Sequence, residues 1–397
     1  MGQFLGQLHA NDIFSAIYNM IISQEVFVDN LGKHQTLVDE GRVDGSLYGD
    51  TKLYYSTDVL KSSEWGNDAE AANLLKLYRP KAPNVQEIVL NKFRQICLTV
   101  DNYLTKRAWS TEGAFNEFNS TMLGWIRDTK KIYDGTTYNV FIGTTESTIG
   151  EQSQSVDLAT TSGHPLNNLS GVEKEQMEAM LIAQKIADIM LAMGDYSRDF
   201  NDYGNLRSYA DEDIKIIWNG KYINKIRKID LPTIFHKDGL IDKFEERNLN
   251  PRYFGTVITE TNKSSYSAAT PAAGKPINSN DNTYVPGANH ANGCIRSIIE
   301  KEVTVSGTSY HVFPGDEIPA GATIKTGGSF ELGEVYIEKD DIICKILVKL
   351  PPYMSAFEVA TSFFNSKSLT ETNYLTFGHN TLEYLKNYPF ITVKASK

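Results

Sequence analysis

Two stretches of alternating residues stand out in the first third of the chain. Residues 53–59 and the return stretch 85–100 alternate apolar side chains with their neighbours, as a half-buried strand does. The polar sequence 62–84 between them contains two Xaa-Pro dipeptides, at 79–80 and 82–83, which break regular structure. The pattern predicts two strands joined by a long polar tip.

A long amphipathic helix is predicted directly after this excursion, from about residue 110 to 134. One stripe of residues recurs at steps of three and four, namely Phe115, Phe118, Met122, Trp125, Thr129 and Ile132. Ser110 or Thr111 can cap the start, and Gly135 is the expected left-handed stop. At ~1.5 Å per residue the helix would be roughly 37 Å long.

The rest of the pattern predicts a mixture of helices and strands. Strands are expected at 137–142, 213–218, 222–229, across 303–350 and at 390–395, with Asn219-Gly220 as a hairpin turn. Helices are expected at 12–26, 170–193, 238–247 and 353–364. The second of these begins at a Ser170/Glu173 capping box. It carries a broad apolar face made of Ala179, Ile182, Ile186, Ile189, Met190 and Met193. Loops are expected at 143–168 and, as a surface insertion, at about 261–293.

The composition indicates a soluble globular protein with excess negative charge. The 397 residues are 41% hydrophobic and 22% charged, enough for one elaborated domain or for two or three smaller ones. The net charge of −10 argues against a dedicated nucleic-acid binder, which would present a basic face. Residues 1–15 lack the features of a signal peptide, and no stretch reaches the roughly 18 apolar residues of a membrane span. We expect synthesis in the cytoplasm.

Few residues suggest a metal or cofactor site. Cys97, Cys294 and Cys344 are widely separated and odd in number, which predicts buried, reduced thiols. His290 and Cys294 have a spacing compatible with a metal, but zinc needs four ligands and no second pair lies nearby. Residues 273–276 resemble the end of a phosphate loop, yet proline stands where Ser or Thr is required. We expect no metal and no cofactor.

Candidate catalytic groups are equally sparse. Adjacent carboxylates occur at Glu245-Glu246, Asp316-Glu317 and Asp340-Asp341. Neighbours on a strand point to opposite faces, so each pair fits a solvated turn or sheet edge better than an acid–base pair. The sequence has no Gly-x-Ser-x-Gly elbow and no catalytic Cys/His signature. We expect no catalytic residue and therefore a structural protein, not an enzyme.

The predicted pair of strands has no third strand close to it in the sequence. An isolated two-stranded hairpin is only marginally stable in water. Such an excursion must lie on another surface, and a second copy of the chain could supply it. Closed symmetric rings would give every copy the same neighbour.

The order of these segments resembles the major capsid protein of tailed bacteriophages, the Hong Kong 97-like fold, which is an α+β fold. Residues 49–65 and 85–104 resemble the strands of the family's extended loop, and residues 111–135 resemble its spine helix. Residues 137–142 resemble the peripheral strand, and 170–218 the axial helix and first central strand. The resemblance implies an N-terminal arm (1–44), an extended loop (45–104), a spine helix with peripheral domain (105–168), an axial domain with the insertion (169–350) and a return with a closing strand (351–397).

The resemblance implies a head protein that self-assembles into pentamers and hexamers of an icosahedral shell in the virion. Its partners would be other copies of itself, a portal protein and double-stranded DNA, which the shell encloses without sequence-specific binding. Assembly would take place in the host cytoplasm. An acidic subunit suits such a wall, because a basic lining would hold DNA through many phosphate contacts.

Two departures from the family pattern matter. The chain lacks the long, charged N-terminal helical region that some members carry as a built-in scaffold, so we expect a separate scaffolding protein or none. The family's covalent cross-link joins a lysine of the extended loop to an asparagine. Lys52, Lys61, Lys76 and Lys81 are available here, but nothing selects one of them. The size and the missing scaffold resemble small short-tailed phages.

Two other functions remain open at this point. An encapsulin-like compartment would use the same fold to hold cargo enzymes instead of a genome. A β-rich carbohydrate-binding surface protein is suggested by 21 Tyr, 18 Phe and the Ser/Thr/Asn-rich loops. The lack of a secretion signal in residues 1–15 argues against the second alternative.

Overall fold

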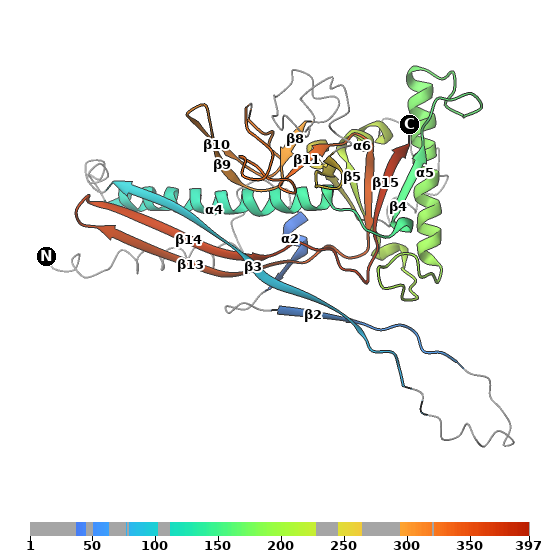
Figure 1. Ribbon diagram of the computed structural model, residues 1–397, viewed down its shortest axis with the longest axis horizontal. Coiled ribbons are helices and arrows are strands. Elements are labelled where there is room, and N and C mark those ends of the chain that lie inside the picture. The colour runs from blue at the N-terminus through green and yellow to red at the C-terminus, as the bar shows by residue number, and fades with distance from the viewer. Residues whose placement is uncertain are drawn as a thin grey trace.

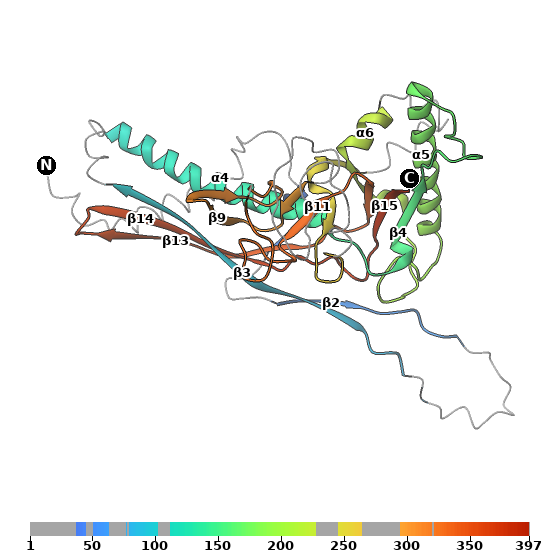
Figure 2. The ribbon, with the colours of Figure 1, turned by 45° about the horizontal axis from the view of Figure 1, so that its top comes forward.

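The computed structural model describes residues 37–44, 51–62, 77, 79–101, 112–227, 245–263, 294–319 and 321–396. These residues form an α+β fold with two five-stranded sheets, two smaller sheets and two long helices. The helix α4 (Glu112–Thr144) lies along one sheet and reaches the other at its C-terminal end, while β2 and the first part of β3 project away from this body (Figures 1 and 2). In the described part of the chain, no helix is long and apolar enough to cross a membrane.

The long helix continues past the residue at which the sequence predicts its end. α4 passes through Gly135 and ends at Thr144, so the predicted stop and the predicted strand at 137–142 are wrong. Tyr138 and Ile142 lie one turn apart and are completely buried in a cluster with residues of the second sheet. Burial of this face outweighs the modest helix propensity of aromatic and β-branched residues, because propensity is only a weak preference.

On the described part of α4, the predicted apolar stripe does not coincide with the buried face. Ile126 and Tyr133 are buried against the long sheet, whereas Trp125 and Ile132 of the predicted stripe are 60% and 49% exposed. The contact face is therefore displaced by one residue, or about 100° around the helix. The side chains of residues 112–123 lie outside the described set.

The long sheet has the strand order β1-β13-β14-β3-β2. β1 is parallel to β13, and the other neighbours are antiparallel. The strands are β1 (Arg42–Asp44), β2 (Thr51–Ser56), β3 (Asn84–Asp101), β13 (Tyr353–Asn365) and β14 (Thr370–Asn380). The predicted excursion is confirmed, since β2 pairs with the first part of β3. The remainder of β3 pairs with β14. The two predicted strands therefore have a third strand beside them in their own chain.

The helix predicted at 353–364 is wrong, because these residues form β13. This strand pairs with β14 from Ser355 opposite His379 to Asn365 opposite Thr370. The local sequence contains Met, Ala and Glu, which favour a helix, but also Val, Thr and Phe, which suit a pleated surface. Pairing with a distant strand decides between the two.

The second sheet has the strand order β4-β15-β12-β5-β6. Its strands are β4 (Ser153–Asp157), β5 (Lys215–Asn219), β6 (Glu245–Leu249), β12 (Ile342–Leu347) and β15 (Phe390–Ser396). The strands predicted at 213–218 and 390–395 are confirmed as β5 and β15. β4 lies within the segment 143–168 that was predicted to be a loop.

A helix replaces the hairpin predicted after β5. α6 (Gly220–Arg227) occupies most of the predicted strand 222–229. β5 and β6 are parallel neighbours, and parallel strands require a crossover connection between them. The Asn219 side chain accepts a hydrogen bond from the Lys221 backbone N–H at 3.0 Å, so it caps a helix instead of turning a hairpin. Only the last three residues of the helix predicted at 238–247 are described, and they lie in β6.

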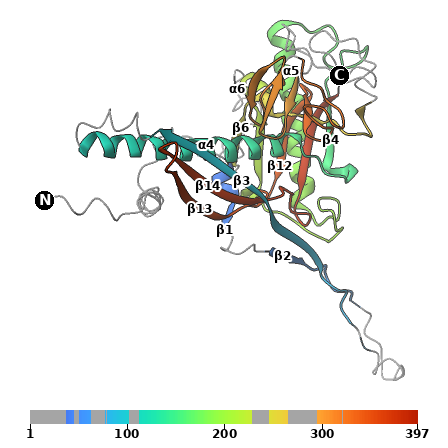
Figure 3. The same ribbon diagram turned by 60° about the vertical axis from the view of Figure 1, so that its left-hand side comes forward.

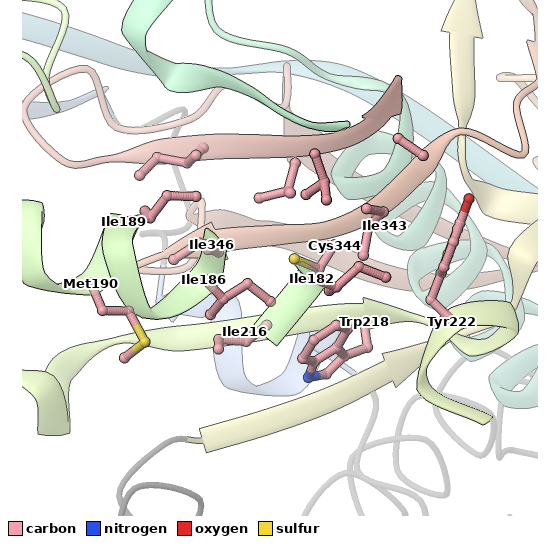
Figure 4. Close-up of a cluster of buried hydrophobic side chains, with 14 of the residues drawn as sticks. Ile182, Ile186, Ile189, Met190, Ile216, Trp218, Tyr222, Ile343, Cys344 and Ile346 are labelled. Atoms are coloured by element: carbon pink, nitrogen blue, oxygen red, sulfur yellow. The ribbon is translucent and has the colours of Figure 1, made fainter. Parts of the chain in front are cut away.

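The largest core lies between α5 (Gly171–Gly194) and the second sheet (Figure 4). All six residues of the predicted α5 face are buried, although the Ser170 side chain makes no capping hydrogen bond. Ile216 and Trp218 of β5 face this core together with Ile346 of β12. Ile217 belongs to the opposite cluster, with Tyr138 of α4. Both faces of the second sheet are therefore covered. Figure 3 shows this sheet beside α4.

The short strands predicted across 303–350 are confirmed. β12 belongs to the second sheet, and the others join a separate β-rich unit with its own apolar cluster. The three-stranded sheet β7-β11-β8 and the hairpin β9–β10 comprise β7 (Gly255–Val257), β8 (Ile295–Ser297), β9 (Lys301–Val305), β10 (Thr308–Val312) and β11 (Val335–Glu338). The remaining short helices are α2 (Leu37–Gly41), η2 (Gly150–Gln152), η3 (Asp211–Asp213) and η5 (Pro251–Tyr253). The helix predicted at 12–26 and most of the predicted insertion lie outside the described residues.

Candidate assembly surfaces

Two of the carboxylates singled out in the sequence, Asp340 and Asp316, have structural partners. Asp340 Oδ2 lies 2.7 Å from Lys221 Nζ, and the Asp340 carbonyl accepts a hydrogen bond from the Tyr222 hydroxyl. Asp316 Oδ2 accepts a hydrogen bond from the Phe313 backbone N–H at 3.0 Å and so closes a turn. Glu245 and Glu246 lie on β6. The described contacts fix loops and helix ends.

The described thiols form no metal site. Cys294 and Cys344 are buried as predicted, whereas Cys97 is exposed on β3, and all three are free. Within the described ranges, no cluster of His, Cys, Asp and Glu could hold a metal ion. His290 and residues 273–276 lie outside the described set.

The hairpin of β2 and β3 presents an apolar face to solvent. The cross-strand register places Tyr55 opposite Val85 and Leu53 opposite Glu87. The exposed apolar residues of this stretch are 39% to 64% accessible, namely Leu53, Tyr55, Val85, Val89 and Phe93. A row of apolar side chains on one face of a projecting hairpin marks a contact surface.

The opposite face of this hairpin is anchored to the chain's own body. Gln86 Nε2 donates to the Tyr384 carbonyl at 2.9 Å, and Gln86 Oε1 accepts from the Lys386 backbone N–H at 2.9 Å. Asn205 Nδ2 donates to Ser56 Oγ at 3.3 Å. One face of the hairpin thus forms hydrogen bonds within the subunit, and the other face is exposed to solvent.

The residues just beyond β2 are also held. Asp58 Oδ1 accepts from the Leu206 backbone N–H at 3.0 Å, and Asp58 Oδ2 lies 2.7 Å from Arg198. Arg207 donates to the Thr57 carbonyl at 2.6 Å. The hydrogen bonds from Leu206 and Arg198 lower the pKa of Asp58 to about 2. No local sequence pattern predicts this contact, because the residues that it joins lie about 140 to 150 positions apart.

The tip of the β13–β14 hairpin is a second apolar surface. Phe363, Phe364 and Leu369 are 61%, 47% and 49% exposed. Consecutive residues of a strand point to opposite faces, so Phe363 and Phe364 make both faces of this tip apolar. A third surface is the exposed side of α4, where Trp125 and Ile132 face outward.

A buried charge cluster ties α4 to the long sheet. The Tyr353 hydroxyl donates to Asp134 Oδ1 at 2.5 Å, and Lys130 Nζ lies 3.2 Å from Asp134 Oδ2 and 2.6 Å from Glu358. Arg42 of β1 lies 3.6 Å from the same Asp134 carboxylate. Burial and the Asp134 carboxylate raise the pKa of Tyr353. These contacts fix the helix on the sheet at one register.

A second buried lysine lies where α4 meets the second sheet. Lys345 of β12 is completely buried, and its Nζ donates to the Thr145 carbonyl at 2.8 Å and to Thr392 Oγ1 at 2.9 Å. Thr145 directly follows the last residue of α4, so the lysine joins the helix end to β12 and β15. Burial lowers the pKa of Lys345 to about 7.

The lysines considered for a covalent cross-link differ little in surroundings. Lys52 is half-buried on β2, and Lys61 and Lys81 are exposed. Lys76 lies outside the described residues. The structure does not single out one of them.

No protein-family model matches the sequence, and no curated protein matches it. Solved structures do match. A chain in the structure of the head fiber and inner core protein gp22 of native bacteriophage P68 has a TM-score of 0.51 at 11% identity, over 91% of this chain and 87% of that chain. A chain of the Staphylococcus phage Andhra capsid has a TM-score of 0.46 at 11% identity, over 94% of this chain and 84% of that one. A chain of the bacteriophage PhiM1 mature capsid has a TM-score of 0.41 at 8% identity, over 93% and 90%. These three chains come from phage particles, and the P68 match shows a shared fold.

Proposed function

We propose that this chain is a major capsid protein that self-assembles into pentamers and hexamers of an icosahedral shell enclosing double-stranded phage DNA. The observation that carries the proposal is the projecting β2–β3 hairpin, which has one face anchored to its own subunit and the other face apolar and open. A contact surface built in this way suits a neighbouring subunit. The fold shared with a phage-particle chain over 91% of the sequence supports the same conclusion.

The proposal includes the finer assignments of the sequence. The segments 1–44, 45–104, 105–168, 169–350 and 351–397 act as N-terminal arm, extended loop, spine with peripheral domain, axial domain and closing return. The partners are other copies of the chain, a portal protein and a separate scaffolding protein. The protein has a structural role in the virion and assembles in the host cytoplasm. Its net charge of −10 suits a shell that encloses DNA without binding it tightly.

Expression of the full chain with size-exclusion chromatography and negative-stain microscopy tests the proposal. Closed shells or ring-shaped capsomers are expected. A 44.4 kDa monomer that never assembles, alone or with the phage's other head proteins, would overturn it. Absorbance of purified particles separates a genome container from an encapsulin-like compartment, because protein-only particles with an enzyme inside would contradict the phage assignment.

A further inference from the structure

The segment between α5 and η3 contains a closed loop, residues 197–207. Ser197 and Arg207 exchange both of their backbone hydrogen bonds, at 3.0 and 2.9 Å, and so join its two ends. Inside the loop, Asn201 Oδ1 accepts from the Asn205 backbone N–H at 2.8 Å, and Asn201 Nδ2 donates to the Asn205 carbonyl at 2.7 Å. Both asparagines are buried. The closed loop therefore keeps its shape through its own hydrogen bonds.

The closed loop is attached to the body of the subunit. Phe200 is buried in the core between α5 and the second sheet. The Asp202 backbone N–H donates to the Lys386 carbonyl at 2.8 Å, and the Tyr384 hydroxyl donates to the Asp202 carboxylate. Gln152 Nε2 donates to the same carboxylate at 3.0 Å. Gln152 directly precedes β4, and residues 384–386 lie shortly before β15, so the position of the closed loop is fixed relative to the second sheet.

The same closed loop holds the chain where it leaves β2. Each of residues 56–58 accepts a hydrogen bond from it, through the Ser56 hydroxyl, the Thr57 carbonyl and both carboxylate oxygens of Asp58. Arg198 Nη1, which lies 2.7 Å from Asp58 Oδ2, also donates to the Gly204 carbonyl at 2.6 Å and is thereby held in place. Consecutive residues of an extended chain point in different directions, so attachment of three of them restricts rotation of this segment.

The return strand is held at a second place. Gln86 of β3 forms hydrogen bonds with the Tyr384 carbonyl and the Lys386 backbone N–H, both at 2.9 Å. Ser56 lies opposite Asn84, two residues before Gln86, so the attachments of the two strands lie in neighbouring residue pairs. A single attachment would allow the hairpin to pivot, whereas one on each strand fixes its direction.

We propose that the closed loop 197–207 is a bracket that fixes the direction in which the extended loop leaves the body, and that Asp58 is the residue through which the bracket holds it. Asp58 suits this role because both of its carboxylate oxygens accept hydrogen bonds, one of them from the Arg198 guanidinium. Hydrogen bonds between charged groups are stronger than neutral ones. The direction is thus set within a single subunit.

The consequence for assembly rests on the proposed function. An extended loop that already has a fixed direction loses less conformational freedom when it forms a contact. Release of the bracket should therefore lower the rate and yield of shell formation without unfolding the subunit. This consequence is the same whichever surface the extended loop contacts.

Pulsed EPR on the unassembled subunit tests the bracket. Spin labels are attached at Leu60→Cys and Leu191→Cys in a Cys97→Ser background, because both leucines are 78% exposed and Cys97 is the exposed native thiol. A narrow distribution of distances between the labels is expected when Asp58 is present. Asp58→Ala should widen it by about 3 Å for each residue of extended chain that is released before Leu60.

Two further variants complete the test. Arg198→Met breaks the same ion pair from the other side, at a side chain that is 49% exposed, and should widen the distribution as well. Asp157→Ala is the matched control, because Asp157 at the end of β4 also accepts a loop backbone N–H, that of Ala159 at 3.0 Å. It should leave the distribution unchanged. Circular dichroism verifies that each variant is folded.

The outcomes separate the bracket from the capsid function. Equal distributions with Asp58 present and in the folded Asp58→Ala and Arg198→Met variants overturn the bracket. A widened distribution together with shells that form at the wild-type rate overturns its role in assembly. A wild-type chain that forms no shells overturns the proposed function instead, because the EPR measurement does not require assembly.

Discussion

Burial of Lys345 makes a quantitative prediction about the pH dependence of stability. The perturbation is Lys345→Met, which keeps a similar length and removes the ammonium group. In the folded protein, burial lowers the pKa of this lysine from 10.5 to about 7. The unfolded chain keeps the ordinary value, so between these two pH values the unfolded state binds about one proton more than the folded state.

The sign of the effect follows from this difference. The unfolded state takes up the extra proton as the pH falls, so the free energy of unfolding decreases from about pH 10.5 down to about pH 7 and is not lowered further below that. The slope is about 1.4 kcal/mol per pH unit, which gives about 2 kcal/mol between pH 7.5 and 9. Lys345→Met lacks this titrating group. Its free energy of unfolding should therefore change by about 2 kcal/mol less than that of the wild type between pH 7.5 and 9.

Urea unfolding of the unassembled subunit at several pH values measures the effect. The quantity compared is the difference between wild type and variant, because the other titrating groups cancel in it. Lys301→Met is the matched control for the loss of an ammonium group, since Lys301 is partly exposed and paired with Glu334. Parallel slopes for wild type and Lys345→Met would refute the assignment of a buried lysine with a lowered pKa.

Three further outcomes are expected. Gly124→Ala should stabilise α4 by about 1 kcal/mol, because nothing lies near the added methyl group, whereas Gly143→Ala should destabilise the protein, because its methyl group would collide with the Tyr253 carbonyl. Thermal unfolding distinguishes the two, and equal effects would contradict the course of α4 beyond Gly135. Tyr353→Phe should cost about 1–3 kcal/mol in chemical denaturation by removing the hydrogen bond to a buried carboxylate, while Tyr310→Phe on the surface should cost almost nothing. Deletion of residues 62–84 should leave a folded subunit that forms no closed shells in electron micrographs, and normal shells would show that the tip is not needed.

Elements with a strong internal pattern were predictable from the sequence. The six apolar residues of α5 repeat at helical spacing, and all are buried. The alternation in residues 53–59 and 85–100 likewise corresponds to the paired strands β2 and β3. In these segments the local period and the tertiary environment agree, so the pattern alone identifies the element.

Elements that depend on distant partners were not predictable. Residues 353–364 could form a helix or a strand, and pairing with β14 decides for the strand. Residues 137–142 alternate like a strand, but Tyr138 and Ile142 are buried only because α4 continues to the second sheet. The anchor of Asp58 on Arg198 joins residues 140 positions apart, for which no local pattern exists.

The sequence by itself determined the order of the segments, the acidic charge and the existence of a long loop followed by a long helix. Only the tertiary structure decided where that helix ends, that β3 has a partner in β14, and which face of the β2–β3 hairpin remains open. The reason is physical. The periodicity of apolar residues indicates which side chains are buried. Hydrogen bonds between residues far apart in the chain determine which surface covers those side chains.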